Sequence, residues 1–313
     1  MSEEQRTLIL GTRGSDLALW QARTVASHMT HLVEVREIST SGDQLQDIPL
    51  QGGTQTGFFT KEIEDRLLHK EIDIAVHSLK DLPTEIVGGL RISACLPRAP
   101  VHDYLLVHPD WHDPSRLLPV KSGTRIGAGS LRRQALIRLY APDTSPELIR
   151  GNVPTRVNKC RTLQYGAIVL ARAGVERLGL DLSGLHVYEL NPLVWLPAPG
   201  QGAVAIQVRQ DDDEAHNAAL VANDAATKEA VDLERALLAQ FEGGCHTAFG
   251  AHAIREGEQW KLLIGMDRGE KGWGQRSYVG SFEELSLLGP AQLPSFEAPE
   301  VTRQEDLCRP VRP

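Results

Sequence analysis

Residues 8–15 of the chain read LILGTRGS and combine the features of a buried strand with those of a turn. The first three residues are apolar and predict a buried strand, whereas Gly11, Gly14 and Ser15 suit a turn. After the turn, apolar residues recur at spacings of three and four as far as Met29, which predicts a helix with one buried face. A buried strand followed at once by such a helix is the repeating unit of α/β proteins.

The same unit recurs along the chain. A proline-containing break at residues 97–100 and a second at residues 196–200 interrupt the pattern, which restarts after each. Strands are predicted at residues 33–38, 72–76, 104–107, 125–127, 148–149, 167–171 and 203–208, and helices at residues 61–69, 130–140 and 153–163. This order favours an α/β fold with mostly parallel sheets.

The two breaks predict the domain organisation. We expect a first α/β domain from residues 1–97 with 198–212 and a second from residues 98–197, hinged at the two crossings. Beyond them, a helical stripe ends at Gly243 and Gly244, and residues 248–254 and 260–265 predict a small antiparallel sheet. Residues 213–313 are therefore expected to form a small α+β domain, loosely ordered after Gly289.

Composition restricts the classes of function. The 313 residues carry a formal net charge of −8, which argues against a general nucleic-acid surface. The four cysteines are widely spaced with no CxxC pair, so we expect neither a metal site nor a redox dithiol, but reduced thiols in the cytoplasm. No apolar run reaches the about 20 residues that span a bilayer, so we expect no membrane partner.

Three strand-to-helix junctions carry anion-binding side chains. Such junctions combine helix N–H groups with cationic donors, and ligands of open α/β sheets bind beyond the carboxyl ends of strands. The residues are Arg13 and Ser15; Ser130, Arg132 and Arg133; and Arg150 and Arg156, with Arg177 in a weaker fourth junction. The alternatives are tight turns and solvated helix faces. Arg132 and Arg133 favour a ligand because they oppose the dipole of their own helix.

A second group follows the strand at residues 72–76. Lys80 and Asp81 offer a cation and a carboxylate that could act on an N–H group or a developing positive charge; the alternative is a solvated ion pair in a turn. His77 before them reads as a structural residue. Cys245, in the run FEGGCH, suits a covalent attachment point, or is an inert buried cysteine. Arginine favours planar recognition of carboxylates, so the predicted ligand carries several acidic groups.

Taken in order, these blocks resemble the porphobilinogen deaminase family, also called the hydroxymethylbilane synthases. The resemblance extends over residues 7–265. The matching blocks are residues 11–15 (GTRGS), 17–22 (LALWQA), 73–83 (DIAVHSLKDLP), 130–134 (SLRRQ), 150–156 (RGNVPTR), 196–203 (LPAPGQGA), 234–236 (ERA) and 242–245 (EGGC).

The resemblance implies two hinged domains like those of periplasmic binding proteins, plus a small third domain whose cysteine, here Cys245, holds a dipyrromethane cofactor by a thioether bond. It implies a monomer that joins four porphobilinogen units head to tail, each losing ammonia, and releases hydroxymethylbilane. It places Asp81 at the catalytic step and beside the cofactor. By the same resemblance Lys80, Ser130, Arg132 and Arg133 bind the cofactor, and Arg13, Ser15, Arg150, Arg156 and Arg177 bind the substrate.

The chain also departs from the family pattern. Residues 51–59 (QGGTQTGFF) lack the two lysines common in that loop, and the usual Thr-Ser before Ser130 is Ala128-Gly129. His102 stands for an expected Arg, Gly166 for an expected Asp, and no last amphipathic helix is evident after Leu288. These departures keep open an alternative: a degenerate or noncatalytic two-lobed anion-binding homologue.

Overall fold

The computed structural model describes residues 6–40, 60–241, 248–289 and 296–311, and the chain divides into two compact units. Unit 1 comprises residues 1–99 and 200–232, and unit 2 comprises residues 100–199 and 233–313. These boundaries lie two residues from the crossings expected after residues 97 and 197. The residues expected to form a third domain are divided between the units, so a separate third domain stays a prediction.

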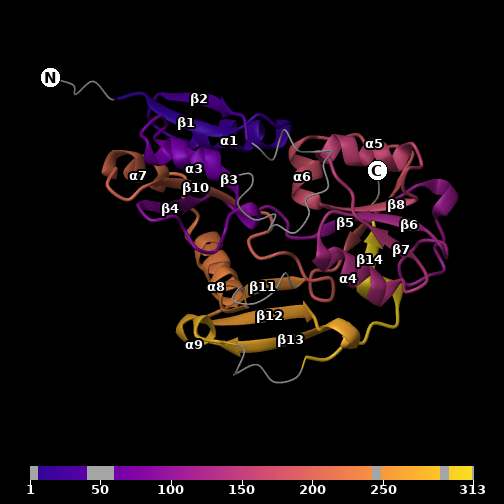
Figure 1. Ribbon diagram of the computed structural model, residues 1–313. Coiled ribbons are helices and arrows are strands. Elements are labelled where there is room, and N and C mark those ends of the chain that lie inside the picture. The colour runs from indigo at the N-terminus through magenta and orange to yellow at the C-terminus, as the bar shows by residue number, and fades with distance from the viewer. Residues whose placement is uncertain (1–5, 41–59, 242–247, 290–295, 312–313) are drawn as a thin grey trace. The chain divides into compact units, whose positions relative to one another are not determined.

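Unit 1 is built on a five-stranded sheet in the order β2-β1-β3-β10-β4 (Figure 1). Its strands are β1 (Leu8–Arg13), β2 (Val33–Ile38), β3 (Ile74–Ser78), β4 (Leu90–Cys95) and β10 (Val204–Arg209). β1 runs parallel to β2 and β3, but β10 runs antiparallel to both β3 and β4. The other four strands therefore run in the same direction, as expected of a mostly parallel sheet, and the exception is β10, the strand that returns after the second crossing.

Helices cover both faces of this sheet. α1 (Asp16–His28) and α7 (Asp213–Leu220) pack on the face that carries Leu10, Val76 and Ile206, and α3 (Lys61–Leu68) packs on the opposite face. Side chains alternate between the two faces along each strand, which accounts for the separate apolar clusters on the two faces. Gly11 permits the close packing of β1, because a Cβ there would lie 2.5 Å from Cδ1 of Ile72.

Unit 2 holds a six-stranded sheet in the order β14-β9-β5-β8-β6-β7. β6 is parallel to β7 and β8, whereas β5 is antiparallel to β8 and β9, so this sheet is also mixed. The strands are β5 (Asp103–Val107), β6 (Arg125–Ala128), β7 (Ser145–Glu147), β8 (Ala167–Ala171), β9 (His186–Leu190) and β14 (Cys308–Pro310); the helices are α4 (Leu131–Tyr140), α5 (Val153–Arg161), α6 (Arg172–Arg177) and α10 (Gln304–Leu307).

Two local expectations for unit 2 are wrong. The strand expected at residues 148–149 lies at β7 instead, an edge position where Pro146 is tolerated. The chain after Gly289 is not loosely ordered throughout, because β14 pairs antiparallel with β9 at the edge of the sheet. The fully buried side chain of Leu307 and the buried Cys308 join the apolar core of the unit, which fixes this segment.

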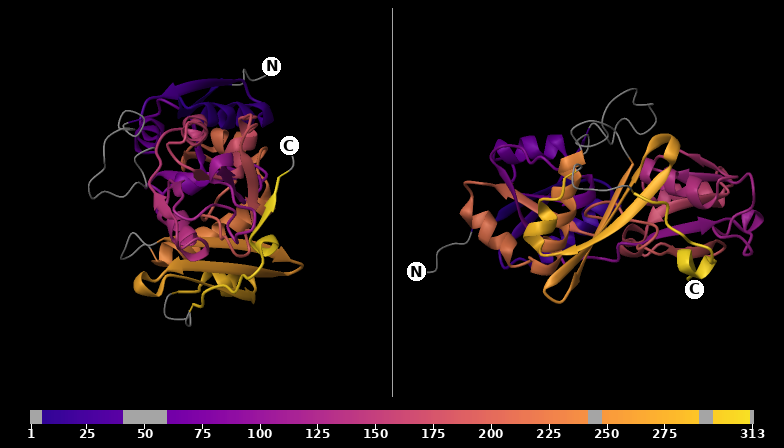
Figure 2. Two further views of the ribbon diagram at one scale, coloured as in Figure 1. Left: turned by 90° about the vertical axis from the view of Figure 1, so that its right-hand side faces the viewer. Right: turned by 90° about the horizontal axis from the view of Figure 1, so that it is seen from below.

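A second sheet of unit 2 contains β11 (Phe249–Glu256), β12 (Gln259–Asp267) and β13 (Trp273–Gly280), seen from two sides in Figure 2. The predicted small antiparallel sheet is confirmed, but β13 was not expected. Leu263 and Trp273 from this sheet share a core with Leu136 of α4. Among the described residues, α9 (Phe282–Ser286) also belongs to unit 2, and α8 (Ala225–Phe241) has its first residues in unit 1 and its last in unit 2. No helix within the described ranges combines the length and apolarity needed to cross a bilayer.

Candidate functional site

Each unit gathers predicted ligand-binding residues at one edge of its sheet. In unit 1, β1 and β3 are parallel and end at Arg13 and Ser78, so the turns that follow leave the same edge. In unit 2, the parallel strands β6, β7 and β8 lead into the segments that carry Ser130, Arg150 and Arg177. Each of these edges is the carboxyl edge, where open α/β sheets bind ligands.

The edge of unit 1 begins with the N-terminus of α1. Ser15 is the N-cap of this helix, and its Oγ accepts a hydrogen bond from the N–H of Ala18 at 3.4 Å. A hydroxyl that accepts a capping bond still has its own proton to donate to an anion. Arg13 ends β1 and is half-buried beside this cap. The pair therefore supplies a guanidinium and a hydroxyl at the start of a helix.

Lys80 and Asp81 lie on the single 3-10 turn η1 (Leu79–Asp81), which follows β3. Leu79 is buried, and its N–H donates to the carbonyl of Ala203 at 3.1 Å. Next to it, Ser78 exchanges hydrogen bonds with the buried side chain of Gln21, at 2.8 and 3.2 Å. These hydrogen bonds to Ala203 and Gln21 hold the turn in place, while the side chains of Lys80 and Asp81 are both exposed.

Three buried polar side chains in unit 1, those of His77, Gln207 and Glu64, are linked by hydrogen bonds. The Nε2–H of His77 donates to Oε1 of Gln207 at 3.1 Å, and Nε2 of Gln207 donates to Oε1 of Glu64 at 2.9 Å. Burial lowers the pKa of His77 to about 4, so the ring is neutral at pH 7. Burial also raises the pKa of Glu64. These contacts agree with a structural role for His77.

Both of the predicted cofactor-binding arginines are buried in unit 2. Arg132 and Arg133 lie in the first turn of α4, whose N-cap Ser130 accepts a hydrogen bond from the N–H of Arg133 at 3.3 Å. Both guanidinium groups pair with the fully buried carboxylate of Asp103, at 3.0 Å for Nη2 of Arg132 and 2.6 Å for Nη2 of Arg133. Nη1 of Arg132 also donates to the carbonyl of Leu196 at 2.5 Å.

Asp103 therefore offsets the conflict between these arginines and the dipole of their helix. Burial alone would raise the pKa of Asp103, but Arg133 and Arg132 hold it well below its ordinary value. The indole N–H of Trp195 donates to the same carboxylate at 3.1 Å. Sequence reasoning missed Asp103, although an acidic residue at the start of an apolar strand is a usable signal. It reaches the carboxyl edge because it pairs with Ala171, the last residue of β8.

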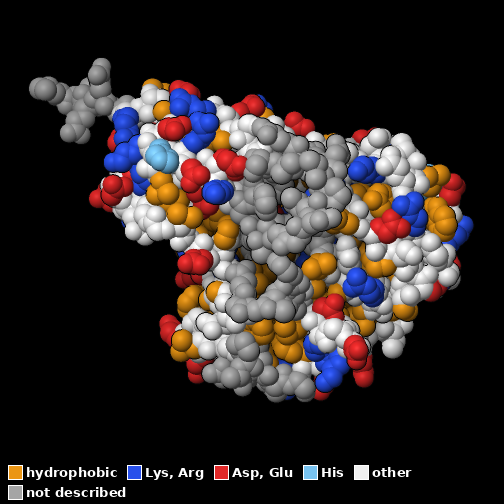
Figure 3. Space-filling view, in the orientation of Figure 1, with side chains coloured by type: hydrophobic (Ala, Val, Ile, Leu, Met, Phe, Trp, Pro, Cys, Tyr) orange, Lys and Arg blue, Asp and Glu red, His pale blue; other side chains and the backbone are white. Residues whose placement is uncertain are grey.

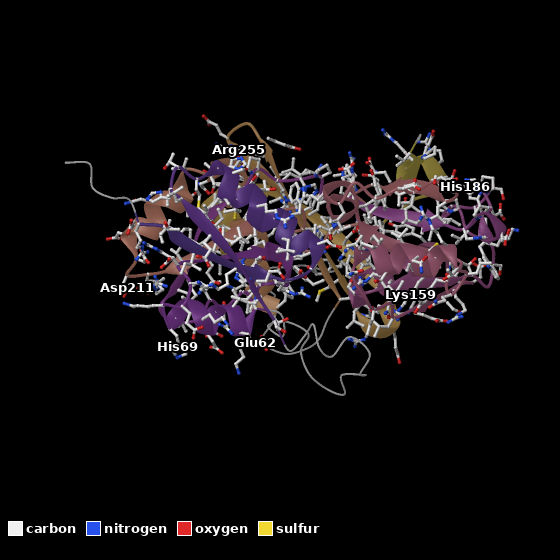
Figure 4. All side chains as sticks on the ribbon, turned by 90° about the horizontal axis from the view of Figure 1, so that it is seen from above. Glu62, His69, Lys159, His186, Asp211 and Arg255 are labelled. Atoms are coloured by element: carbon white, nitrogen blue, oxygen red, sulfur yellow. The ribbon has the colours of Figure 1, made fainter. Side chains whose placement is uncertain are left out.

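The remaining predicted substrate-binding residues surround the start of α5 and the end of α6. Asn152 caps α5 by accepting a hydrogen bond from the N–H of Thr155 at 2.9 Å, as the early proline at 154 predicts. Nε of Arg156 donates to the carbonyl of Gly151 at 2.7 Å. Lys159, labelled in Figure 4, donates to the carbonyl of Arg150 at 3.1 Å. At the end of α6, burial lowers the pKa of Arg177 to about 10.

The other departures from the family pattern include Gly166 and His102, which lie among the described residues. Gly166 leaves room for Trp111, whose Cγ would lie 2.6 Å from a Cβ at position 166, so an Asp would not fit there. Nε2 of His102 lies 3.5 Å from Oε1 of Glu189. Cys245 and the loop at residues 51–59 lie outside the described residues. Within the described ranges, no group of three or more His, Cys, Asp or Glu side chains could hold a metal ion.

Together, two α/β units that carry arginines, a lysine and helix-capping hydroxyls at their carboxyl edges define a protein suited to an anionic organic ligand. Residues 8–217 match the family model described as porphobilinogen deaminase, dipyromethane cofactor binding domain. The chain belongs to the porphobilinogen deaminase family.

Curated relatives support this assignment along most of the chain. A porphobilinogen deaminase of Roseiflexus sp. (strain RS-1) is 41% identical over 84% of this chain and 86% of that protein. The Roseiflexus castenholzii protein of the same name is 38% identical over 92% of this chain and 94% of its own. A third, from Syntrophomonas wolfei, is 41% identical over 88% and 89%.

Solved structures give a much weaker likeness. The VFT2 domain of Bordetella pertussis BvgS aligns with a TM-score of 0.42 and 13% identity, over 69% of this chain and 86% of that chain. Such a score adds no weight to the family assignment. The α/β class itself follows from the sheets and helices described above.

Proposed function

We propose that this chain joins four porphobilinogen units head to tail, with loss of one ammonia at each step, and releases hydroxymethylbilane. The observation that carries this proposal is the family match over residues 8–217, which includes every predicted site residue except Cys245. The curated relatives that cover most of both chains bear the name of the same enzyme.

The side chains present fit a dipyrromethane cofactor. That group carries several carboxylates, so it requires N–H and O–H donors. Lys80 is an exposed ammonium, and the hydroxyl of Ser130 caps α4 at the carboxyl edge of unit 2. With Arg132, Arg133 and Asp81 they would hold the cofactor, and Cys245 would form its thioether. When bound, the cofactor supplies the pyrrole carbon to which the first substrate unit is joined.

The other predicted residues receive the substrate. Its acetate and propionate groups would be bound by Arg13, Ser15, Arg150, Arg156 and Arg177, which offer guanidinium forks and one hydroxyl. In each step the carbon–nitrogen bond to the substrate's amino group breaks and the nitrogen leaves as ammonia, a carbon–carbon bond forms, and the attacked pyrrole carbon loses a proton. Release of the product then uses one water molecule, whose hydroxyl group becomes that of hydroxymethylbilane. The carboxylate of Asp81 would accept a hydrogen bond from a pyrrole N–H and stabilise the positive charge that develops as ammonia leaves.

An assay with porphobilinogen tests this function. Purified protein should release four ammonia molecules for each hydroxymethylbilane formed, because each addition breaks one carbon–nitrogen bond. A reaction without protein provides the background. Binding of porphobilinogen with no release of ammonia would contradict the enzymatic function and support a noncatalytic anion-binding homologue instead.

We further propose that the protein acts in the cytoplasm as a monomer, without a nucleic-acid or membrane partner. Its net charge of −8 supports the absence of a nucleic-acid partner, since protein surfaces that bind nucleic acids are basic. On the face seen in Figure 3, Lys and Arg side chains are interspersed with Asp and Glu. The three-domain division, with residues 213–313 carrying the cofactor cysteine, also stays part of this proposal.

A further inference from the structure

Gly129 lies directly against the guanidinium group of Arg156 within unit 2. A Cβ at position 129 would lie 2.7 Å from Nη1 and 3.4 Å from Cζ of Arg156. The former distance is well inside van der Waals contact, so in this chain the guanidinium occupies the space that the side chain of the usual Ser at position 129 would need. The carbonyl of Ile149 is 3.5 Å from the same point, so the end of β6 and the segment before α5 approach closely here.

A second glycine, Gly151, holds the guanidinium group of Arg156 through a backbone hydrogen bond. Nε of Arg156 donates to the carbonyl of Gly151 at 2.7 Å. Gly151 has a φ of 106°, a left-handed conformation that favours glycine. Arg156 itself follows the Asn152 cap in the first turn of α5. The backbone at Gly151 therefore orients the guanidinium, and the missing side chain at Gly129 provides the room for it.

We propose that Gly129 is a positioning residue that sets the guanidinium of Arg156 at the carboxyl edge of β6, and thereby sets the affinity for a carboxylate of porphobilinogen. The proposal rests on the substrate-binding role proposed above for Arg156. A guanidinium recognises a carboxylate through two parallel hydrogen bonds, so a displacement of about one ångström weakens both. Gly129 itself touches no substrate in this account.

Gly129→Ala tests the proposal with little risk to folding. Gly129 is outside the left-handed region, and the atom that a Cβ would displace is the far end of a flexible side chain. We expect kcat/KM for porphobilinogen to fall about tenfold through a higher KM, with kcat close to that of the parent. Gly88→Ala is the matched control, because a Cβ there meets nothing within 4 Å and the backbone is also outside the left-handed region.

A double-mutant cycle decides whether Gly129 acts through Arg156. In an Arg156→Lys background, Gly129→Ala should change KM no further, because the fork that it displaces is gone. Provided that the parent enzyme turns over, two results would overturn the proposal. One is an unchanged KM for Gly129→Ala in the parent background. The other is the same tenfold fall in kcat/KM when Gly129→Ala is added to Arg156→Lys. A parent protein that forms no hydroxymethylbilane would remove the proposed function, and this proposal with it.

Discussion

The carboxyl edges of the two units use charged residues in opposite ways. In unit 1, Lys80 and Asp81 are exposed on a turn whose neighbour Leu79 is buried. In unit 2, Arg132 and Arg133 are 4% and 5% exposed and share the buried carboxylate of Asp103. At the edge of unit 1 the charged side chains are exposed to solvent, whereas at the edge of unit 2 two charged side chains are buried and paired with a carboxylate.

The difference predicts that substitutions at Lys80 or Asp81 change binding or turnover alone, whereas substitutions at Arg132, Arg133 or Asp103 also change stability. A substitution at an exposed, well-anchored turn removes a functional group and leaves the core intact. A substitution in a buried ion pair leaves its partners charged and desolvated, which costs far more than the pair itself contributes. The two edges should therefore respond to the same kind of change, Asp to Asn, in distinguishable ways.

The largest effect is expected for Asp103→Asn. It leaves Arg132 and Arg133 without their carboxylate and should lower the free energy of unfolding by about 3–5 kcal/mol. Denaturant unfolding monitored by tryptophan fluorescence would measure this, with exposed Asp110→Asn of the same unit as control. Because the pKa of Asp103 is depressed, the parent should lose this stability as pH falls below about 4, and the variant should not. Equal stability of the two variants would contradict the assigned buried network.

Asp81→Asn should affect turnover instead of stability. Loss of the carboxylate should lower kcat by about 10²–10³-fold, the usual cost of removing one transition-state electrostatic partner. The unfolding midpoint should remain that of the parent because Asp81 is exposed. Steady-state kinetics with porphobilinogen would measure this, and Asp65→Asn on α3 provides an exposed acidic control in the same unit. A variant with parental kcat would show that Asp81 has another role.

The smallest effect is expected for His77, which forms hydrogen-bonded contacts with Gln207 and, through it, Glu64 in unit 1. The folded-state pKa of His77 is about 4, below its usual value near 6.5, so the unfolded chain binds the extra proton first. Stability should therefore fall as pH decreases from about 6.5 to 4, by up to roughly 3 kcal/mol. His77→Gln should flatten this dependence, measured by unfolding at several pH values. The same slope in parent and variant would mean that His77 is not held neutral by burial.

The local features of both edges could be predicted from the sequence, because each depends on neighbours within a few residues. The helix caps at Ser15, Ser130 and Asn152 and the turn after β3 are of this kind. The antiparallel course of β10 and the pairing of β14 with β9 depend on segments more than 100 residues apart, for which the sequence has no local signal. For Asp103 the sequence does carry a local signal, an acidic residue at the start of an apolar strand, but its pairing with Arg132 and Arg133 of α4 depends on the tertiary fold.

The proposed synthesis of hydroxymethylbilane by this chain requires a primer attached to Cys245. Denaturing mass spectrometry of the intact protein, purified from cells that make porphobilinogen, tests it most directly. The account predicts a mass above that of the chain by two linked pyrrole units, and a bare chain mass for Cys245→Ser made in the same cells. A bare mass for the parent, or an added mass that persists in Cys245→Ser, would contradict it.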